Sequence, residues 1–322
     1  MKRKKIKILN IEPRGYSLEA KRILMNCGEL IEFEASRKEL LDIIGDYDAL
    51  IVRLGHRIDS TVLKKASKLK VIVTPTTGLD HIDTEYARKK GVKVLSLQGE
   101  TEFLRSVSAT AEHTWALLLA LIRRIPWAFS SVLEGKWDRD SFRGTELHGK
   151  RLGILGLGRL GIKVAFYGLA FGMKVYFYDP YCKSWPDNIK RCSKLNELLS
   201  KSDIFSIHIP LNDKTERLIG YKELSRLPRG ALLVNTSRGA LLDSAALVEL
   251  LTSGHLGAAA LDVLIREHDF KEHPDNKLVI GYARKHNNLL VTPHLGGATR
   301  ESMAKTEFFM ADKLKNCLRC IR

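Results

Sequence analysis

Short apolar runs alternate with longer amphipathic segments from one end of the chain to the other. Segments of helical period lie between the runs, for example over 60–68 and 84–90. Strands that alternate with helices form right-handed βαβ units, so the pattern predicts an α/β protein with two doubly wound parallel sheets. The predicted strands are 6–9, 49–52, 70–73 and 92–95 for the first sheet, and 152–155, 175–178, 204–207, 232–234, 258–263 and 289–291 for the second.

Two further helices indicate where the domains meet. The segment 109–125 contains Trp115, Leu118 and Leu121 among many other apolar residues, which is too apolar for a helix with a solvated face. We expect it to be buried between domains or between subunits. The helix expected over 300–318 follows the last strand, so it can pack back on the first domain.

The composition is that of a folded globular protein. The 322 residues are 44% hydrophobic and 28% charged, which excludes a mostly disordered or fibrous chain and suits about two domains. No apolar run approaches the ~20 residues that cross a bilayer, and the first residues lack the apolar core of a signal peptide. Five scattered cysteines fit reduced thiols. We therefore expect a cytoplasmic protein with no membrane partner.

The charge of the chain is strongly positive. It carries 53 Lys and Arg residues against 37 Asp and Glu residues, a formal net charge of +16. A basic protein can bind nucleic acid or attract small anions. Because the basic residues are spread along the chain, we interpret them as a solvated surface and do not expect a nucleic-acid partner. A small anionic substrate suits this charge.

A glycine motif predicts a dinucleotide site. Gly156, Gly158 and Gly161 follow a predicted strand and open a helix expected over 159–171. In that setting the first glycine makes the tight turn, the second admits a pyrophosphate and the third lets helix and strand pack closely, while the helix N-terminus attracts the phosphates. Asp179 ends the next strand, where a carboxylate accepts hydrogen bonds from ribose hydroxyls and repels a 2′-phosphate. The motif therefore predicts NAD rather than NADP.

Three later segments follow predicted strands of the second sheet and carry Arg238, Glu267 and His294. Open α/β sheets bind ligands at the carboxyl ends of their strands. Interconversion of an alcohol and a ketone needs a group that gives and takes a proton near neutral pH, and His294 is suited to it. Glu267 can bond the imidazole and stabilise its charged form, and Arg238 can hold a carboxylate through paired hydrogen bonds. The set predicts hydride chemistry on a hydroxy acid.

These motifs resemble the D-isomer-specific 2-hydroxyacid dehydrogenases, and most closely the D-3-phosphoglycerate dehydrogenase branch. The resemblance covers nearly the whole chain and is most specific over 144–161, 235–239, 260–263 and 292–297. It implies a flavodoxin-like substrate-binding domain at 1–107 plus 299–322 and a Rossmann NAD-binding domain at 108–298. It also implies NAD-dependent hydride transfer to or from a D-2-hydroxy acid such as 3-phosphoglycerate, with Arg238, Glu267 and His294 as catalytic residues.

The resemblance assigns further residues to the two binding sites. Asp262 falls where the nicotinamide amide is bound, and the loop 77–80 falls where backbone groups hold the substrate carboxylate. The cofactor-binding residues implied are Gly156, Gly158, Arg159, Leu160, Gly161, Asp179, His208, Pro210, Thr215, Thr236, Ser237, Arg238, Asp262, His294 and Gly296. The substrate-binding residues implied are Arg53, Thr77, Gly78, Arg238 and His294. A homodimer formed largely by the apolar helix is also implied, and no metal is expected.

Several departures leave the substrate open. The segment 99–107 is longer than usual and is expected to be a loop, and a second extended stretch lies between Glu267 and His294. Position 74 is Thr where the phosphoglycerate branch tends to carry Arg, so Arg53 and Arg57 remain as candidate phosphate ligands. The chain ends after its closing helix, so we expect no regulatory domain.

The alternatives are a reductase of glyoxylate, hydroxypyruvate or another 2-keto acid, a relative acting on a modified sugar acid, and a corepressor-like protein that senses NAD(H) without turnover.

Overall fold

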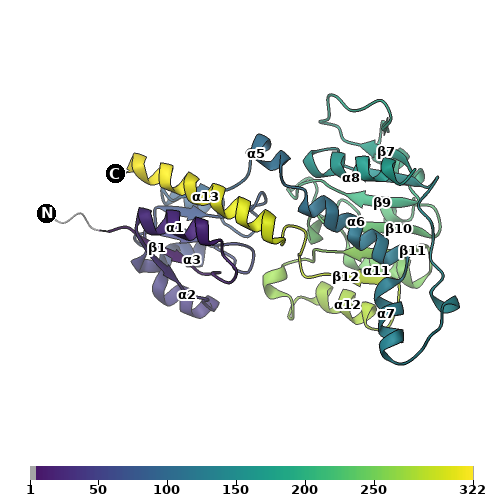
Figure 1. Ribbon diagram of the computed structural model, residues 1–322, viewed down its shortest axis with the longest axis horizontal. Coiled ribbons are helices and arrows are strands. Elements are labelled where there is room, and N and C mark those ends of the chain that lie inside the picture. Colours follow the sequence, from purple (N-terminus) through teal and green to yellow (C-terminus); the bar gives the residue numbers. More distant parts are fainter. Residues whose placement is uncertain (1–4, 322) are drawn as a thin grey trace. The chain divides into compact units, whose positions relative to one another are not determined.

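The computed structural model describes residues 5–321 and divides into two compact units. One unit takes the chain up to Ser106 and again from Ala298, and the other comprises Val107–Gly297. The chain therefore leaves the first unit, builds the second, and returns to complete the first with its last helix (Figure 1).

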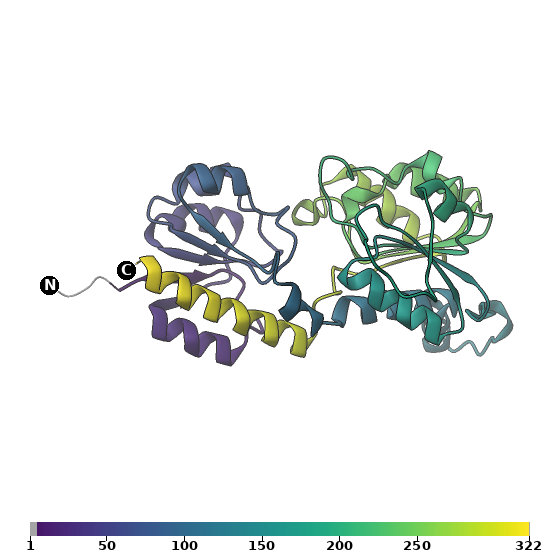
Figure 2. The same cartoon turned by 90° about the horizontal axis from the view of Figure 1, so that it is seen from above.

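The amino-terminal unit contains, within its described residues, a five-stranded parallel sheet in the order β2-β1-β3-β4-β5. Strands β3 and β4 are fully buried because helices cover both faces. The long last helix lies alongside α1 (Figures 1 and 2). The elements are β1 Lys7–Asn10, α1 Leu18–Cys27, β2 Glu29–Glu32, α2 Arg37–Ile43, η1 Ile44–Asp46, β3 Ala49–Ile51, α3 Ser60–Lys65, β4 Val71–Val73, α4 Thr84–Lys89, β5 Lys93–Leu95, α5 Thr101–Arg105 and α13 Arg300–Ile321.

The second unit contains a seven-stranded parallel sheet in the order β12-β11-β10-β9-β6-β7-β8 among its described residues. Helices α6 and α8 cover one face, and α9 to α12 cover the other. The strand order reverses between β6 and β9, which is where doubly wound sheets bind ligands. The elements are α6 Ala109–Ile122, α7 Ile125–Leu133, η2 Asp140–Phe142, β6 Arg151–Leu155, α8 Arg159–Ala170, β7 Lys174–Tyr178, β8 Lys190–Arg191, α9 Leu195–Ser200, β9 Ile204–Ile207, α10 Tyr221–Leu224, β10 Ala231–Asn235, η3 Gly239–Leu241, α11 Ser244–Thr252, β11 Leu256–Leu261, η4 Glu267–Asp269, α12 Pro274–Ala283 and β12 Leu289–Val291.

The predicted fold class is confirmed, since both sheets are parallel and each is packed between helices. All ten predicted strands form, with ends shifted by at most two residues. Strands β2 and β8 were not predicted. They lie at sheet edges and are partly or fully exposed, so their polar residues hide the strand pattern.

Two predicted segments differ in the structure. The helix expected over 109–125 ends at Ile122, because Arg124 adopts a left-handed backbone (φ 53°) and a separate helix, α7, starts beyond it. The expected loop over 99–107 contains the short helix α5. Phe103 of α5 stacks on Phe309 of α13 with ring centroids 4.1 Å apart, so this segment is packed within the first unit.

Among the described residues, no single helix has the length and apolar character to cross a bilayer. A bent pair, Thr101–Ile122 with Ile125–Leu133, meets that test by length and composition alone.

Candidate active site

Three polar loops of the second unit lie close together at the carboxyl ends of its strands. Strands β10, β11 and β12 are parallel neighbours, so the loops that follow them emerge together. These loops carry Arg238, Glu267 and His294, respectively. The structure thus places the three predicted catalytic residues at the carboxyl ends of adjacent strands.

His294 and Glu267 form a direct pair. The Nδ1 atom of His294 lies 2.6 Å from Oε2 of Glu267, and Oε1 of Glu267 accepts a hydrogen bond from the Leu264 amide at 3.1 Å. The His294 backbone is left-handed, with φ at 55°, a conformation that histidine tolerates better than most residues. Because Nδ1 is engaged by the carboxylate, Nε2 is the nitrogen that can exchange a proton with a substrate.

Asp262 fixes the backbone around His294. Its side chain is 1% exposed and accepts hydrogen bonds from the amides of Leu295 and Gly296, both at 2.7 Å. Its carbonyl oxygen accepts the His294 amide at 2.8 Å. Burial raises the pKa of Asp262, but the hydrogen bonds from His113, Thr292 and the Leu295 amide outweigh burial and lower the pKa overall. Asp262 is therefore an anion that clamps the histidine loop.

Arg238 sits in a loop held by its own motif. The side chain of Asn235 donates to the Arg238 carbonyl at 2.9 Å and accepts the Ser237 amide at 3.0 Å. A Cβ at Gly239 would overlap the backbone of Leu264, so only glycine allows the Arg238 loop to approach the Glu267 loop this closely. The glycine of this motif therefore brings two catalytic loops together.

The glycine loop after β6 fits a dinucleotide. Gly156 has φ at 90°, and a Cβ there would lie 2.7 Å from the carbonyl oxygen of His208. A Cβ at Gly161 would overlap the Gly156 carbonyl, whereas no described atom lies within 4 Å of a Cβ built on Gly158. Gly156 is crowded as a tight turn requires, and Gly161 is crowded as a close helix–strand contact requires. The open space at Gly158 fits a pyrophosphate.

Asp179 lies beside this glycine loop. Its carboxylate accepts the Leu157 amide at 3.0 Å and the Tyr181 amide at 2.8 Å through different oxygens. Oδ1 also accepts the Cys182 amide at 3.2 Å, whereas Oδ2 accepts only the Leu157 amide and keeps a site for a ribose hydroxyl. Leu160 and Arg159 open α8, and Arg159 donates to the Val107 carbonyl at 3.1 Å. Burial lowers the pKa of Arg159.

The other predicted cofactor residues follow β9 and β10. Burial lowers the pKa of His208 to about 4, which favours the neutral imidazole, and its Nε2 atom lies 2.8 Å from the Ser206 hydroxyl. Thr215 donates to the Pro210 carbonyl at 2.8 Å and shapes this loop. Ser237 donates to the Ile207 carbonyl, and the buried Thr236 bonds Thr114.

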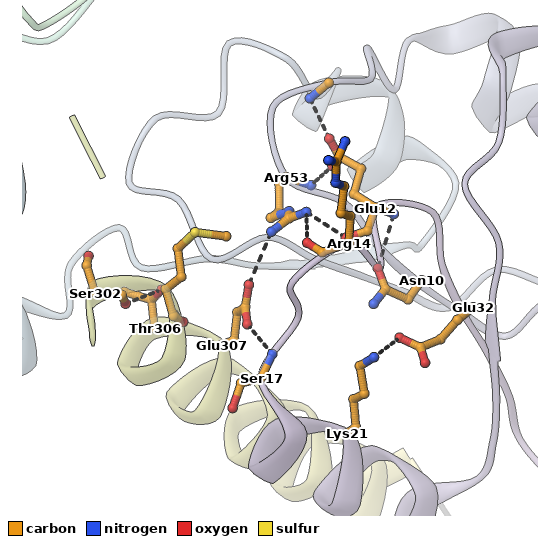
Figure 3. A network of polar contacts seen from close by, with 12 residues as sticks. Asn10, Glu12, Arg14, Ser17, Lys21, Glu32, Arg53, Ser302, Thr306 and Glu307 are labelled. Atoms are coloured by element: carbon orange, nitrogen blue, oxygen red, sulfur yellow. Dashed lines mark hydrogen bonds and ion pairs between the residues drawn. The ribbon is translucent and has the colours of Figure 1, made fainter. Parts of the chain in front are cut away.

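The predicted substrate residues Arg53, Thr77 and Gly78 lie in the first unit. The Arg53 guanidinium donates to the carbonyls of Glu12 and Arg14 and lies 3.4 Å from the carboxylate of Glu307, a residue of α13 that is 1% exposed (Figure 3). Much of its donor capacity is thus used inside the unit. Arg57 is exposed.

The loop of Thr77 and Gly78 is braced by hydroxyls. Thr76 donates to the Gly78 carbonyl at 2.8 Å, and its oxygen lies 2.9 Å from that of the fully buried Thr74. Thr74, which stands where the phosphoglycerate branch tends to carry Arg, therefore supports this loop from within.

Three residues near the catalytic set were missed in the sequence: His113, Thr114 and Thr292. His113 and Thr292 bond Asp262, and Thr114 bonds Thr236. The available signal was the polar pair His113-Thr114 directly before the apolar run 115–122 of the same helix, since buried polar groups need partners.

Comparison with known proteins agrees with this geometry. Residues 115–296 match the family model of the D-isomer specific 2-hydroxyacid dehydrogenase, NAD binding domain. A D-3-phosphoglycerate dehydrogenase of Methanocaldococcus jannaschii is 38% identical over 98% of the chain, which spans only 58% of that relative. A hydroxypyruvate reductase of Thermotoga maritima is 35% identical over 92% of the chain and 94% of its own length. The solved D-lactate dehydrogenase of Aquifex aeolicus, complexed with NAD and lactic acid, superposes with a TM-score of 0.84 at 27% identity, covering 97% of this chain and 95% of the other.

Proposed function

Because the chain belongs to the D-isomer-specific 2-hydroxyacid dehydrogenase family, we propose that it transfers a hydride between NAD and a D-2-hydroxy acid. The observation that carries the proposal is the pair of His294 and Glu267, 2.6 Å apart, beside the loop of Arg238 at the carboxyl edge of an NAD-binding sheet. A proton-handling group, a partner for its charged form and a cation for a carboxylate are what this reaction needs.

In the direction of reduction, Nε2 of His294 donates a proton to the carbonyl oxygen as it becomes a hydroxyl. Glu267 holds Nδ1, orients the ring and stabilises the imidazolium before the proton leaves. Arg238 holds the substrate carboxylate and polarises the carbonyl. Bound NADH supplies the hydride. In the direction of oxidation, His294 takes the hydroxyl proton.

We assign the cofactor preference to Asp179. Its Oδ2 atom accepts the Leu157 amide of the glycine loop, so the carboxylate is placed to accept a ribose hydroxyl and to repel a 2′-phosphate. NAD is therefore preferred over NADP.

The substrate has two candidates, 3-phosphoglycerate and an unphosphorylated acid such as glycerate or glycolate. We favour the second. The Arg53 guanidinium is held by Glu307 and two backbone carbonyls, and position 74 is a buried Thr rather than an Arg. Both features reduce the positive charge that a distal phosphate would need.

A panel of 2-keto acids tests the proposal. Oxidation of NADH is followed by absorbance with glyoxylate, hydroxypyruvate, pyruvate and 3-phosphohydroxypyruvate. Turnover of at least one acid is expected. NADH binding with no turnover of any acid would instead favour the corepressor-like reading, in which the dinucleotide is sensed and not consumed.

We also propose a homodimer in the cytoplasm. Every residue of α7 is at least partly exposed, and Phe129 and Leu133 are 62% and 72% exposed, which favours an apolar surface covered by a second copy. Among the described residues, Cys182, Cys192 and Cys317 form no disulfide bond, as in a reducing compartment. Sedimentation equilibrium tests the dimer, and a Phe129→Asp/Leu133→Asp variant is expected to shift it towards a monomer.

A further inference from the structure

A histidine outside the predicted catalytic set contacts the buried carboxylate behind it. His113 lies on α6, and its Nε2 atom is 3.0 Å from Oδ1 of Asp262 and 3.2 Å from the hydroxyl of Thr292. The imidazole is 18% exposed and the carboxylate 1% exposed. A hydrogen bond to an ionised group in such surroundings is stronger than one at the surface.

The two oxygens of Asp262 are used unequally. Oδ1 is bonded by His113, by the Thr292 hydroxyl at 2.6 Å and by the Leu295 amide at 2.7 Å, whereas Oδ2 is bonded by the Gly296 amide. With three donors on one oxygen, the carboxylate has little rotational freedom. The amides that it holds directly follow His294, so its orientation sets that of the catalytic loop.

The same helix also holds the loop of Arg238. Thr114, the residue after His113, has its hydroxyl 2.8 Å from that of the buried Thr236, two residues before Arg238. A Cβ on Gly296 would lie 3.1 Å from the Thr110 side chain, so α6 packs closely on the histidine loop as well. One turn of α6 therefore contacts both loops whose spacing the chemistry requires.

We propose that His113 is a positioning residue of this site, which acts through Asp262 to hold the loop of His294 in its reactive orientation. The inference rests on the proposed dehydrogenase function. Without the imidazole donor, Oδ1 loses one of its three hydrogen bonds, and the carboxylate can rotate away from the Leu295 amide. His294 would then lose the backbone restraint that maintains its left-handed conformation. Turnover depends on that orientation more than substrate binding does.

A matched set of variants tests this role. His113→Leu removes the donor, and His113→Gln keeps an N–H at a similar reach. His286→Leu is the control. His286 is exposed and stacks on Tyr282, and it precedes β12, so it lies at the amino ends of the strands, away from the catalytic loops. For each variant we would measure kcat and KM for a 2-keto acid at saturating NADH, the melting temperature, and the NMR signal of the His294 imidazole with and without NADH.

His113→Leu is expected to lower kcat roughly 10–100-fold, the usual cost of losing a partner that orients a functional side chain. KM should change by about threefold or less, because the groups that bind the substrate remain. His113→Gln should recover most of the loss, and the His294 signal should shift in His113→Leu but not in His286→Leu.

Three results would overturn the inference: an unchanged kcat and His294 signal in His113→Leu, a loss explained wholly by a smaller folded fraction, or a Gln variant as slow as the Leu variant. If the wild-type protein reduces no 2-keto acid, the proposed function fails, and the NMR comparison then decides the positioning role alone. A shifted His294 signal would support it and an unshifted one would overturn it.

Discussion

Nδ1 of His294 donates to the carboxylate of Glu267 at 2.6 Å, although the two residues are 27 positions apart in the chain. The pair forms because β11 and β12 are parallel neighbours, so the loops that follow them share one edge of the sheet. As a result, the two nitrogens of the imidazole have different roles. Nδ1 is committed to orientation and charge stabilisation, and Nε2 is left for the substrate proton.

His294→Ala is expected to abolish most turnover while NADH still binds. The residue handles the proton, and the phosphates are held elsewhere, at the glycine loop. A general acid or base contributes roughly 10²–10⁴-fold to the rate. Steady-state rates beside a fluorescence titration of NADH check this. A variant that keeps more than about a tenth of wild-type turnover would contradict the assignment, since that loss is below the expected range.

Glu267→Gln is expected to keep the ring in place and lose the charge that stabilises the imidazolium. A hydrogen bond to a charged group contributes about 1.5–3 kcal/mol, which corresponds to a loss of roughly 10–150-fold in kcat. Binding of NADH should be unchanged. If the Gln variant turned over at the wild-type rate, Glu267 would serve only to orient the ring.

Arg238→Lys is expected to lower activity strongly although it keeps the positive charge. Lysine lacks the planar fork that holds a carboxylate through two hydrogen bonds, so KM should rise and kcat should fall together. The measurement is a full kinetic analysis alongside the melting temperature. A loss of stability with normal kinetics of the folded fraction would make Arg238 a structural residue.

The pattern of apolar runs was enough to predict every strand of the two described sheets except the edge strands β2 and β8, and the glycine spacing was enough to predict the turn after β6. Both predictions depend only on residues that are close together in the sequence. The contact of His113 with Asp262 spans 149 residues, and that of Arg53 with Glu307 spans 254. Such side-chain pairings arise only when distant segments pack together. The local periodicity of the sequence does not indicate such pairings, so neither of these two contacts was predicted.

Substitutions of Arg53 and Arg57 by Ala are expected to differ in their effect on stability. Arg53→Ala would leave the buried Glu307 carboxylate with fewer partners, and burial already raises the pKa of Glu307. The expected cost in the free energy of unfolding is about 1–3 kcal/mol, with activity on every substrate reduced alike. Arg57→Ala, an exposed change, should alter stability by less than about 0.5 kcal/mol.

Thermal unfolding and rates with phosphorylated and unphosphorylated acids measure this difference. Adding Glu307→Gln to Arg53→Ala should restore part of the stability, because the uncompensated charge is removed. A selective loss of phosphorylated substrates in Arg53→Ala, at wild-type stability, would instead make Arg53 a phosphate ligand.

Asp179→Ser is expected to narrow the preference between NAD and NADP from both sides. The carboxylate accepts the amides of Leu157 and Tyr181, so it is fixed beside the glycine loop, where the ribose of a dinucleotide lies. Serine removes the acceptors of the ribose hydroxyls, which should weaken NAD by about 1.5–3 kcal/mol. It also removes the negative charge that opposes a 2′-phosphate, so NADP should improve. Arg191 donates to the Asp179 carbonyl at 3.1 Å, and this cation near the vacated position should favour NADP further without reversing the preference. The ratio of kcat/KM with NAD and NADP, in the wild type and the variant, measures the effect. A ratio that does not move would mean that the Asp179 carboxylate does not face the ribose.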